Sequence, residues 1–313
     1  MSKIPQGMKA SGPARLEAKR GNTVIKRGVR RVLRRLGYDI LKIPAIQSFR
    51  PAPEPPPFAP IWPLPRRAPG PSDEEIRKEF ARHQFWHYGY EFDGDLSFPT
   101  RHVNPGLDTD DPRRPLQRFR HFMPYLIQAQ GGTLKGKRVL DIACNSGFWS
   151  IQCGLLGAEV IGFDARAELI EQANLLKRIT GADGVEFKVL DFWRMSPGAL
   201  GGEFDVVLNL GVLYHLPKPL EALELTRMMA RKHILLDTAT HPSEEFAIHL
   251  KWEEPFDIRT ATDAGIVGLP TKPGVELMLR HLKVSGWFEI PVRNREIPIE
   301  YLTGRRASWL IAV

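Results

Sequence analysis

The segment 137–150, KRVLDIACNSGFWS, carries the residues whose types and spacing most clearly indicate chemistry. A short apolar run ends in Asp141, and the turn residues Ala143, Asn145 and Gly147 precede a helical pattern. A strand, a tight turn of small residues and a helix start form the corner that holds nucleotides in open α/β sheets. We predict such a corner here, and the alternative is a plain turn that holds no ligand.

Further polar residues follow the next three strand-like runs. Asp164 lies 23 residues beyond Asp141, the spacing at which a carboxylate accepts hydrogen bonds from ribose hydroxyls. Asp191 follows the third run, in the sequence LDFW. The fourth run, FDVVLNLGVLYHL, leads into a loop that supplies the remaining candidates, Asn209, Gly211, Tyr214 and His215.

These candidates require alternating strands and helices to bring them to one edge of a sheet. Apolar runs predict strands at 137–142, 158–163, 184–189, 204–210 and 232–237, and helical periodicity predicts helices at 147–156, 166–179 and 218–230. This alternation predicts an α/β fold with a doubly wound, mostly parallel sheet. A helix at 274–285 and strands at 286–292 and 305–313 are expected to close it.

The turn resembles the first motif of class I S-adenosylmethionine-dependent methyltransferases, D-x-G-x-G-x-G, which reads Asp141-Ile-Ala143-Cys-Asn145-Ser-Gly147 here. Asn tolerates a positive φ better than most residues, so Asn145 is a workable replacement for glycine. Ala143 fits only if its φ is negative. The resemblance implies a Rossmann-like sheet with an antiparallel last strand and S-adenosylmethionine as cofactor. It also implies these cofactor-binding residues: Asp141, Ala143, Asn145, Gly147, Asp164, Asp191, Asn209, Gly211 and Tyr214.

Within this class the chain is similar to the tRNA wobble-uridine carboxymethyltransferase family and to methyltransferases associated with polysaccharide assembly. The resemblance is carried by a W-H-aromatic segment at 86–88, C-N-S-G-F at 144–148 and G-V-L-Y-H-L at 211–216. A carboxylated cofactor would need a positive group, which the sequence does not place. We therefore favour ordinary methyl transfer to an oxygen or nitrogen acceptor, such as a glycan, a lipid or another small molecule. Modification of tRNA is the alternative.

A methyl sulfonium is already reactive, so the enzyme has mainly to orient an acceptor and remove its proton. His215 is a candidate general base, since its unperturbed pKa lies near neutrality; alternatively it only shapes the cofactor pocket with Tyr214. His241, His249, Glu253 and Glu254 in the long insert 241–272 are alternative bases or acceptor contacts. The histidines come from separate elements, so we predict no metal site.

The region 72–130 is predicted to form a helical and aromatic cap, which begins with the capping box Ser72–Glu75. Its aromatic group either packs as core or closes over the substrate, and the substrate-contact candidates are Trp86, His87 and Tyr88, together with His241 and Trp252 of the insert. An arginine cluster near 113–120 either holds an anionic group or is a solvated helix face.

The net charge of +8 is concentrated at the start of the 313-residue chain. Residues 1–50 hold 13 Lys/Arg and 2 Asp/Glu, whereas the remainder of the chain holds 31 Lys/Arg and 34 Asp/Glu. Residues 22–42 form a basic amphipathic helical pattern, which predicts binding to an anionic membrane surface or an acidic polymer, or packing on the chain's own domain. Residues 51–71 contain ten prolines and predict a spacer.

Four predictions concern the protein as a whole. Two cysteines and no 18-residue apolar run favour a cytoplasmic protein, at most peripheral at the inner membrane face. The expected domains are the tail 1–50, the spacer 51–71, the cap 72–130 and the catalytic domain 131–313. A non-catalytic cofactor-binding protein is the competing class. A nicotinamide-dependent oxidoreductase is disfavoured, because G-x-G-x-x-G is missing and the last strand ends the chain.

Overall fold

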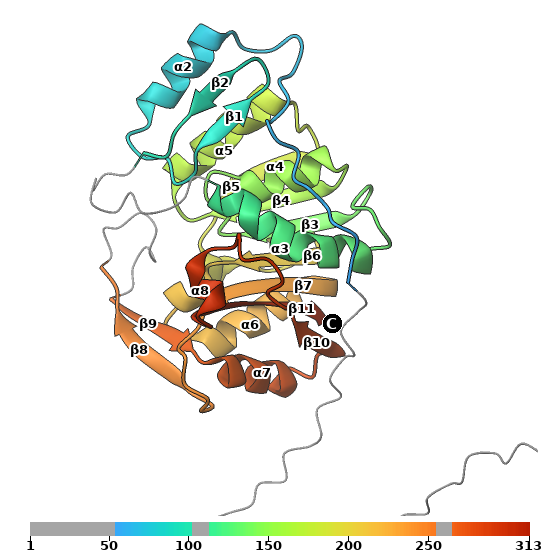
Figure 1. Ribbon diagram of the computed structural model, residues 1–313, viewed down its shortest axis with the longest axis vertical. Coiled ribbons are helices and arrows are strands. Elements are labelled where there is room, and N and C mark those ends of the chain that lie inside the picture. Colours follow the sequence, from blue (N-terminus) through green and yellow to red (C-terminus); the bar gives the residue numbers. More distant parts are fainter. Residues whose placement is uncertain (1–53, 102–112, 255–264) are drawn as a thin grey trace, which may run out of the picture. The chain divides into compact units, whose positions relative to one another are not determined.

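The computed structural model describes residues 54–101, 113–254 and 265–313 (Figure 1). The predicted basic helix at 22–42 therefore lies outside the described residues. A seven-stranded sheet forms the centre, and its strands in spatial order are β10 (Gly286–Glu289), β11 (Arg306–Ala312), β7 (Ala230–Ala239), β6 (Phe204–Leu210), β3 (Arg138–Ile142), β4 (Glu159–Asp164) and β5 (Val185–Val189). The five strands from β7 to β5 are parallel, whereas β11 is antiparallel to both of its neighbours. The predicted Rossmann-like sheet with an antiparallel last strand is confirmed.

Helices cover both faces of this sheet. One hydrophobic cluster joins the sheet to α3 (Arg114–Ala129), α4 (Phe148–Leu155) and α5 (Ala167–Thr180). A second cluster joins the other face to α6 (Pro219–Met228) and α7 (Lys272–His281). The strand alternation explains the division, because Val139 of β3 belongs to the first cluster and its neighbour Leu140 to the second. Buried on both faces, the parallel strands read as continuous apolar runs in the sequence.

The chain direction fixes where functional loops gather. All five parallel strands end at the same edge of the sheet, and the crossover helices return the chain to the opposite edge. The turn after β3, the residues after β4 and β5, and the loop after β6 therefore meet at this edge. Short 3-10 helices, η3 (Phe192–Arg194) and η4 (Leu213–His215), follow β5 and β6 there.

The region before the sheet contains α2 (Asp73–Arg82) and the antiparallel pair β1 (Tyr90–Phe92) and β2 (Leu96–Phe98). The predicted capping box is present: Ser72 Oγ accepts from the backbone N–H of Glu75, and the Glu75 carboxylate accepts from the Ser72 N–H. Phe80 of α2 stacks on Phe98 with ring centroids 3.7 Å apart. This small aromatic layer fixes β1 and β2 against the helix.

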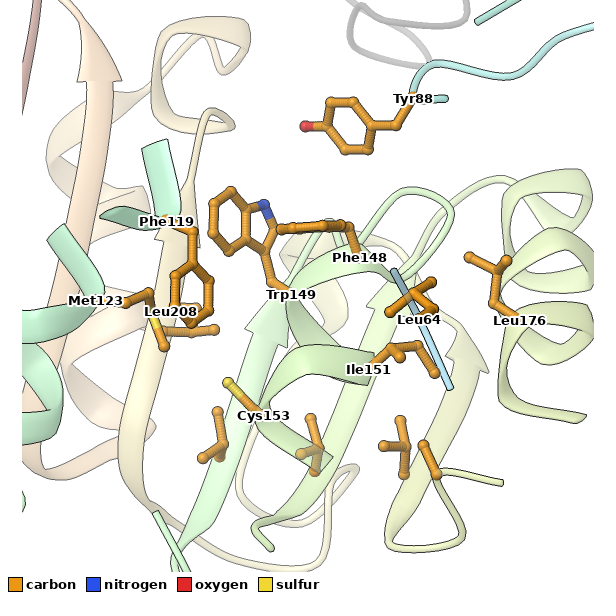
Figure 2. Close-up of a cluster of buried hydrophobic side chains, with 14 of the residues drawn as sticks. Leu64, Tyr88, Phe119, Met123, Phe148, Trp149, Ile151, Cys153, Leu176 and Leu208 are labelled. Carbon is orange, nitrogen blue, oxygen red and sulfur yellow. The ribbon is translucent and has the colours of Figure 1, made fainter. Parts of the chain in front are cut away.

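The prediction of a free spacer is wrong from Glu54 onward, because this stretch packs along the body. The backbone of Ile61 exchanges two hydrogen bonds with the buried side-chain amide of Gln152, at 2.9 and 2.8 Å. Leu64 is 1% exposed and its N–H donates to the Glu91 carbonyl of β1. Its side chain lies between α4 and α5 in Figure 2. The prolines here prevent regular structure but still allow an extended strap to pack.

Leu64 gives a direct test of this packed strap. Leu64→Ala should lower the free energy of unfolding by roughly 2–5 kcal/mol, since it empties a buried leucine site. Chemical denaturation of the two proteins measures the difference. Leu302→Ala is the control, because that side chain is 45% exposed and should change stability by less than about 0.5 kcal/mol. A spacer that contributes nothing to the fold would give equal stabilities for both variants.

Part of the insert 241–272 has regular structure. It contains an antiparallel pair, β8 (Ile248–Trp252) and β9 (Ile266–Pro270), which lies beside the sheet domain in Figure 1. β9 approaches the loop after β6, and the Gly268 N–H donates to the Leu216 carbonyl at 3.0 Å. The hairpin therefore extends the functional edge of the sheet. A last short helix, α8 (Ile299–Leu302), precedes β11.

Candidate active site

A cavity of about 1110 Å³ opens at the functional edge of the sheet. Its walls come from the turn after β3, the ends of β4 and β5, the loop after β6, the cap region, the β8–β9 hairpin and the start of β11. Its volume is sufficient for a nucleoside-sized cofactor together with part of a second molecule. Six predicted cofactor-binding residues line this cavity: Ala143, Asn145, Asp164, Asp191, Gly211 and Tyr214.

The turn after β3 adopts a strained backbone. Ala143 has φ +52° and Asn145 has φ +53°. The expectation of a negative φ at Ala143 is therefore wrong. Asn145 does adopt the positive φ that asparagine was expected to tolerate. The turn thus has a positive φ at the two positions where the motif D-x-G-x-G-x-G has glycine and this chain does not. Gly147 is retained because its φ is +85° and a Cβ there would lie 2.7 Å from the Phe187 ring. The strain is held by hydrogen bonds on both sides of the turn, from Cys144 N–H to the Phe163 carbonyl and from Asn145 N–H to Asp164.

Three predicted cofactor-binding residues do not line the cavity but support the residues that do. Asp141 is buried at the end of β3 and accepts a hydrogen bond from Ser150 Oγ at 2.6 Å. Burial raises its pKa to about 7 despite this bond. Asn209 is buried in β6, where its amide donates to Thr226 of α6 at 3.0 Å. With Gly147 at the start of α4, these residues position the turn and strand rather than facing the cavity.

Two carboxylates face the cavity from adjacent strands. Asp164, at the end of β4, is 5% exposed and accepts hydrogen bonds from the backbone N–H groups of Asn145 and Arg166, each at 3.1 Å. Burial raises the pKa of Asp164 above its ordinary value. Asp191 caps η3 and accepts from the Trp193 N–H at 2.8 Å. Backbone bonds thus fix both carboxylates and leave them lone pairs for hydroxyl or amine donors.

A histidine–carboxylate pair lies at the loop after β6. His215 Nδ1 is 2.6 Å from the Glu253 carboxylate, which reaches it from the residue after β8, and both side chains line the cavity. The two side chains are 15% and 7% exposed. A carboxylate at Nδ1 fixes that nitrogen as the donor, so Nε2 is the nitrogen that can accept a proton. The pair has the arrangement of an oriented general base.

Tyr214 joins this pair to an arginine. The Tyr214 and His215 rings lie 4.0 Å apart, and the Arg306 guanidinium lies 5.5 Å from the Tyr214 ring centroid. Burial acts to raise the pKa of Tyr214, but the charges of His215 and Arg306 outweigh it and lower that pKa to about 7. For His215, burial lowers the pKa, whereas Tyr214 and the hydrogen bond to Glu253 raise it, with a net rise above the ordinary value.

A buried ionic network lies behind Tyr214. Asp237 of β7 is fully buried and accepts from Arg118 of α3 at 2.7 Å, from Arg306 Nε at 2.7 Å and from Ser308 at 2.7 Å. Tyr301 donates to the same carboxylate. Burial alone would raise the pKa of Asp237. The positive charges of Arg306 and Arg118 outweigh burial and hold the pKa of this carboxyl well below its usual range.

This network gives one end of the cavity a positive charge. Arg118 and Arg306 also line the cavity, and among the described residues it is the carboxylate of Asp237 that pairs with both. Gly211 allows this approach, since its φ is +93° and a Cβ would lie 3.0 Å from the Arg306 guanidinium. Two buried cations against one anion leave the cavity suited to a negatively charged or phenolic ligand group.

The predicted substrate residues divide into two groups. His87, Tyr88 and Trp252 line the cavity, whereas Trp86 and His241 do not. Trp86 is 2% exposed, stacks on Phe80 at 4.2 Å and donates its indole N–H to the Phe80 carbonyl. The lid role predicted for Trp86 is therefore wrong, because its ring forms the core of the cap.

His241 is also displaced from the site. It stacks on His249 with ring centroids 3.6 Å apart, at the base of the β8–β9 hairpin. Tyr88, by contrast, lies over the edge of the core cluster that contains Phe148 and Trp149 (Figure 2). Trp86 and Tyr88 both belong to this core cluster, but of the two only Tyr88 also lines the cavity.

Residues from distant parts of the sequence complete the site. Arg306 was not predicted, because it reads as a polar residue at the start of the last strand. Asp237 likewise reads as the end of a buried strand. Arg118 belonged to the predicted arginine cluster, and the structure separates it from its neighbours by burying it at 3% exposure. The sequence did contain a signal for Arg118, which is a charged residue on an otherwise apolar face of the helix.

In the described ranges, no helix has both the length and the apolar character needed to cross a bilayer. In the same ranges, no three or more His, Cys, Asp or Glu side chains are grouped so that they could hold a metal ion.

Comparisons with known proteins agree with the fold. Residues 133–261 match the model of a methyltransferase domain family. The tRNA U34 carboxymethyltransferase of Helicobacter hepaticus is 30% identical over 136 residues, covering 41% of this chain and 42% of that protein. The ubiquinone biosynthesis O-methyltransferase of Bordetella parapertussis is 28% identical over 127 residues, which cover 40% of this chain and 51% of that protein. The chain thus spans about half the length of the curated relatives it matches.

The fold extends beyond the sequence match. The crystal structure of the N-terminal domain of EvdMO1 with SAH bound superposes with a TM-score of 0.59 at 18% identity, covering 79% of this chain and 98% of that one. This likeness establishes the fold of the sheet and its flanking helices. The fold and the family match together define a Rossmann-like methyltransferase domain. The residues that match this methyltransferase domain family, 133–261, include the motif at 141–147.

Proposed function

We propose that the protein transfers a methyl group from S-adenosylmethionine to a hydroxyl or amine acceptor, with His215 as general base. The observation that carries the proposal is the cavity itself. It takes its first wall from the carboxylates at the ends of β4 and β5, on one side of β3, and its second wall from the His215–Glu253 pair at the loop after β6, on the other side of β3. A cofactor bound at the first wall and an acceptor at the second would meet between them.

The residues at the first wall fit a nucleoside. Asp164 ends β4, the first strand after the cofactor turn, and its remaining lone pairs would accept hydrogen bonds from the two ribose hydroxyls. Asp191, Phe192 and Trp193 form the neighbouring wall, where a carboxylate and aromatic rings suit a purine base. The backbone of the turn at Ala143 and Asn145 faces the same space and would hold the amino-acid part of the cofactor.

The residues at the second wall fit proton removal. The bound cofactor would supply an electrophilic methyl group. His215 Nε2 would accept the acceptor's proton, while Glu253 keeps the proton on Nδ1 and stabilises the imidazolium that forms. Tyr88 and Tyr214 narrow the space beside His215, which would exclude water and align the acceptor.

Carboxymethyl transfer, as in a tRNA wobble-uridine enzyme, is a second candidate, and one observation favours it. The positive group that a carboxylated cofactor requires is present, since Arg118 and Arg306 line the cavity beside Tyr214. The same cationic end would equally hold a carboxylate or phosphate of an acceptor. Competition between S-adenosylhomocysteine and carboxy-S-adenosylmethionine for the purified protein separates the two: a large preference for the carboxylated compound, lost in Arg306→Gln, supports carboxymethyl transfer.

Asp164 tests the placement of the cofactor. Asp164→Ala should weaken S-adenosylhomocysteine binding about tenfold or more, because a hydrogen bond to a charged group contributes roughly 1.5–3 kcal/mol. Isothermal calorimetry measures the affinity, and thermal unfolding shows whether the variant is folded. Asp183→Ala is the control, since that exposed carboxylate pairs only with Arg67 near the surface. A folded Asp164→Ala protein with unchanged affinity would show that the ribose lies elsewhere.

The partner proposed for the basic residues 22–42 is an anionic membrane surface or an acidic polymer. The amphipathic charge pattern supports it. Sedimentation with anionic vesicles at increasing salt tests it, with binding expected to fall steeply as salt rises.

A further inference from the structure

An exposed apolar row lies along the β8–β9 hairpin. Ile248, Leu250 and Trp252 alternate along β8 and so share one face, and they are 41%, 73% and 64% exposed. Ile266 lies opposite Trp252 on β9 and is 51% exposed. The positions opposite Leu250 and Ile248 are Gly268 and Pro270. We call Ile248, Leu250, Trp252 and Ile266 the apolar row, and no polar side chain interrupts this face of the hairpin.

Packing against the described parts of the chain leaves the row largely exposed. The other face of the hairpin is packed, since Val267 is 1% exposed and His249 stacks on His241. On the row's own face, Pro219 of α6 lies against Gly268 but leaves Leu250 and Trp252 exposed. An antiparallel pair with one packed face ordinarily carries polar residues on its other face. Four adjacent large apolar side chains left exposed are the kind of patch that marks a binding surface.

The row leads into the proposed active site. Trp252 and Ile266 line the mouth of the cavity, and the residue after Trp252 is Glu253, the partner of His215. Leu250 and Ile248 continue the row away from the mouth along β8. A molecule whose reactive group lies beside His215 would therefore emerge from the cavity onto this row.

We propose that the acceptor is amphipathic, with a hydroxylated or amino head in the cavity and an aliphatic chain lying along the apolar row. This inference rests on the proposed function and names its substrate class. A broad partner, such as a second copy of the chain, would cover the mouth formed by Trp252 and Ile266 and obstruct the cavity. A single aliphatic chain attached to a head inside the cavity uses the mouth and the row together.

The test uses alkyl gallates, which share one trihydroxyphenyl head and differ in chain length. Binding of propyl, octyl and dodecyl gallate to the full chain saturated with S-adenosylhomocysteine is measured by calorimetry below the micellar concentrations. Each fully buried methylene improves affinity about fourfold, and a partly covered chain gains less. We expect the dodecyl ester to bind at least about tenfold more tightly than the propyl ester.

Variants locate the chain on the row. Leu250→Gln should remove most of the gain with chain length, because Leu250 is 73% exposed and lines no part of the cavity. Leu277→Gln is the matched control on α7, where the side chain is 44% exposed, and it should keep the full gain. Affinity for S-adenosylhomocysteine should be the same in all three proteins.

Three results would overturn the inference. The first is equal affinity across the ester series, and the second is an equal loss in Leu250→Gln and Leu277→Gln. The third is self-association of the wild type that Leu250→Gln abolishes, which would make the row an interface between copies. If S-adenosylhomocysteine binds while the ester series shows no trend, only the substrate class fails. If S-adenosylhomocysteine itself does not bind, the proposed function fails as well.

Discussion

Replacing His215 by alanine should lower the turnover number by about 10²–10⁴-fold, the range that a positioned general base contributes. Cofactor affinity should change little, because the carboxylates of β4 and β5 lie at the other wall. The measurement is single-turnover transfer from labelled S-adenosylmethionine, with the melting temperature recorded on the same samples. A folded His215→Ala protein with normal turnover would mean that His215 only shapes the pocket.

The pH dependence distinguishes the base from a structural histidine. Transfer requires neutral His215, so the rate should be low at acid pH and rise as pH increases through the His215 pKa. Because Tyr214 and Glu253 raise that pKa, the midpoint should lie above about 6.5. Glu253→Gln removes the charge that favours the imidazolium, so the midpoint should move to lower pH while the plateau rate falls. A variant with the wild-type midpoint would contradict the proposed role of Glu253.

Asp237→Asn should lower the free energy of unfolding by about 3–5 kcal/mol, since it leaves buried cations without their counter-charge. Arg118 and Arg306 both bind this carboxylate, and each is no more than 5% exposed. Denaturant unfolding monitored by circular dichroism gives the value. Few single substitutions on this chain should cost more, because the network joins α3, β7 and β11.

A surface pair provides the comparison for Asp237. Asp183→Asn breaks an ion pair with Arg67 in which both side chains are about half exposed, and it should cost less than about 1 kcal/mol. Similar small losses in both variants would mean that Arg118 and Arg306 find other anions when Asp237 loses its charge. The two guanidiniums would then not define a fixed cationic end of the cavity.

The fold could be predicted from the sequence because its signals are local. Apolar runs that alternate with helical patterns predict every strand of the parallel sheet, with boundaries within about two residues of those observed. The capping box at Ser72 and Glu75 depends only on neighbouring residues. The cofactor turn likewise lies within one short segment, so its position follows from residue types alone.

The remaining site could not be predicted because it depends on tertiary contacts. Arg118, Asp237 and Arg306 come from three separate elements, and only the pairing of β7 with β11 and the packing of α3 bring them together. The proline-rich stretch was misassigned for a related reason. Its prolines indicate an extended chain, but burial of Leu64 depends on the surface that α4, α5 and β1 offer. Trp86 packs on Phe80 within the cap, whereas Tyr88 lines the cavity. The residues next to them in the sequence do not reveal this difference.

The most direct test of the account is transfer of label from methyl-labelled S-adenosylmethionine into fractionated lipid, glycan, RNA and small-molecule pools. We expect wild-type protein to label one pool and Asp164→Ala to fail to label it at limiting cofactor. We expect His215→Ala to bind the cofactor but to label the pool at least about 100-fold more slowly. Tight binding of S-adenosylhomocysteine by the wild type, with no label transferred to any pool, would contradict it and indicate a cofactor-binding protein without catalysis.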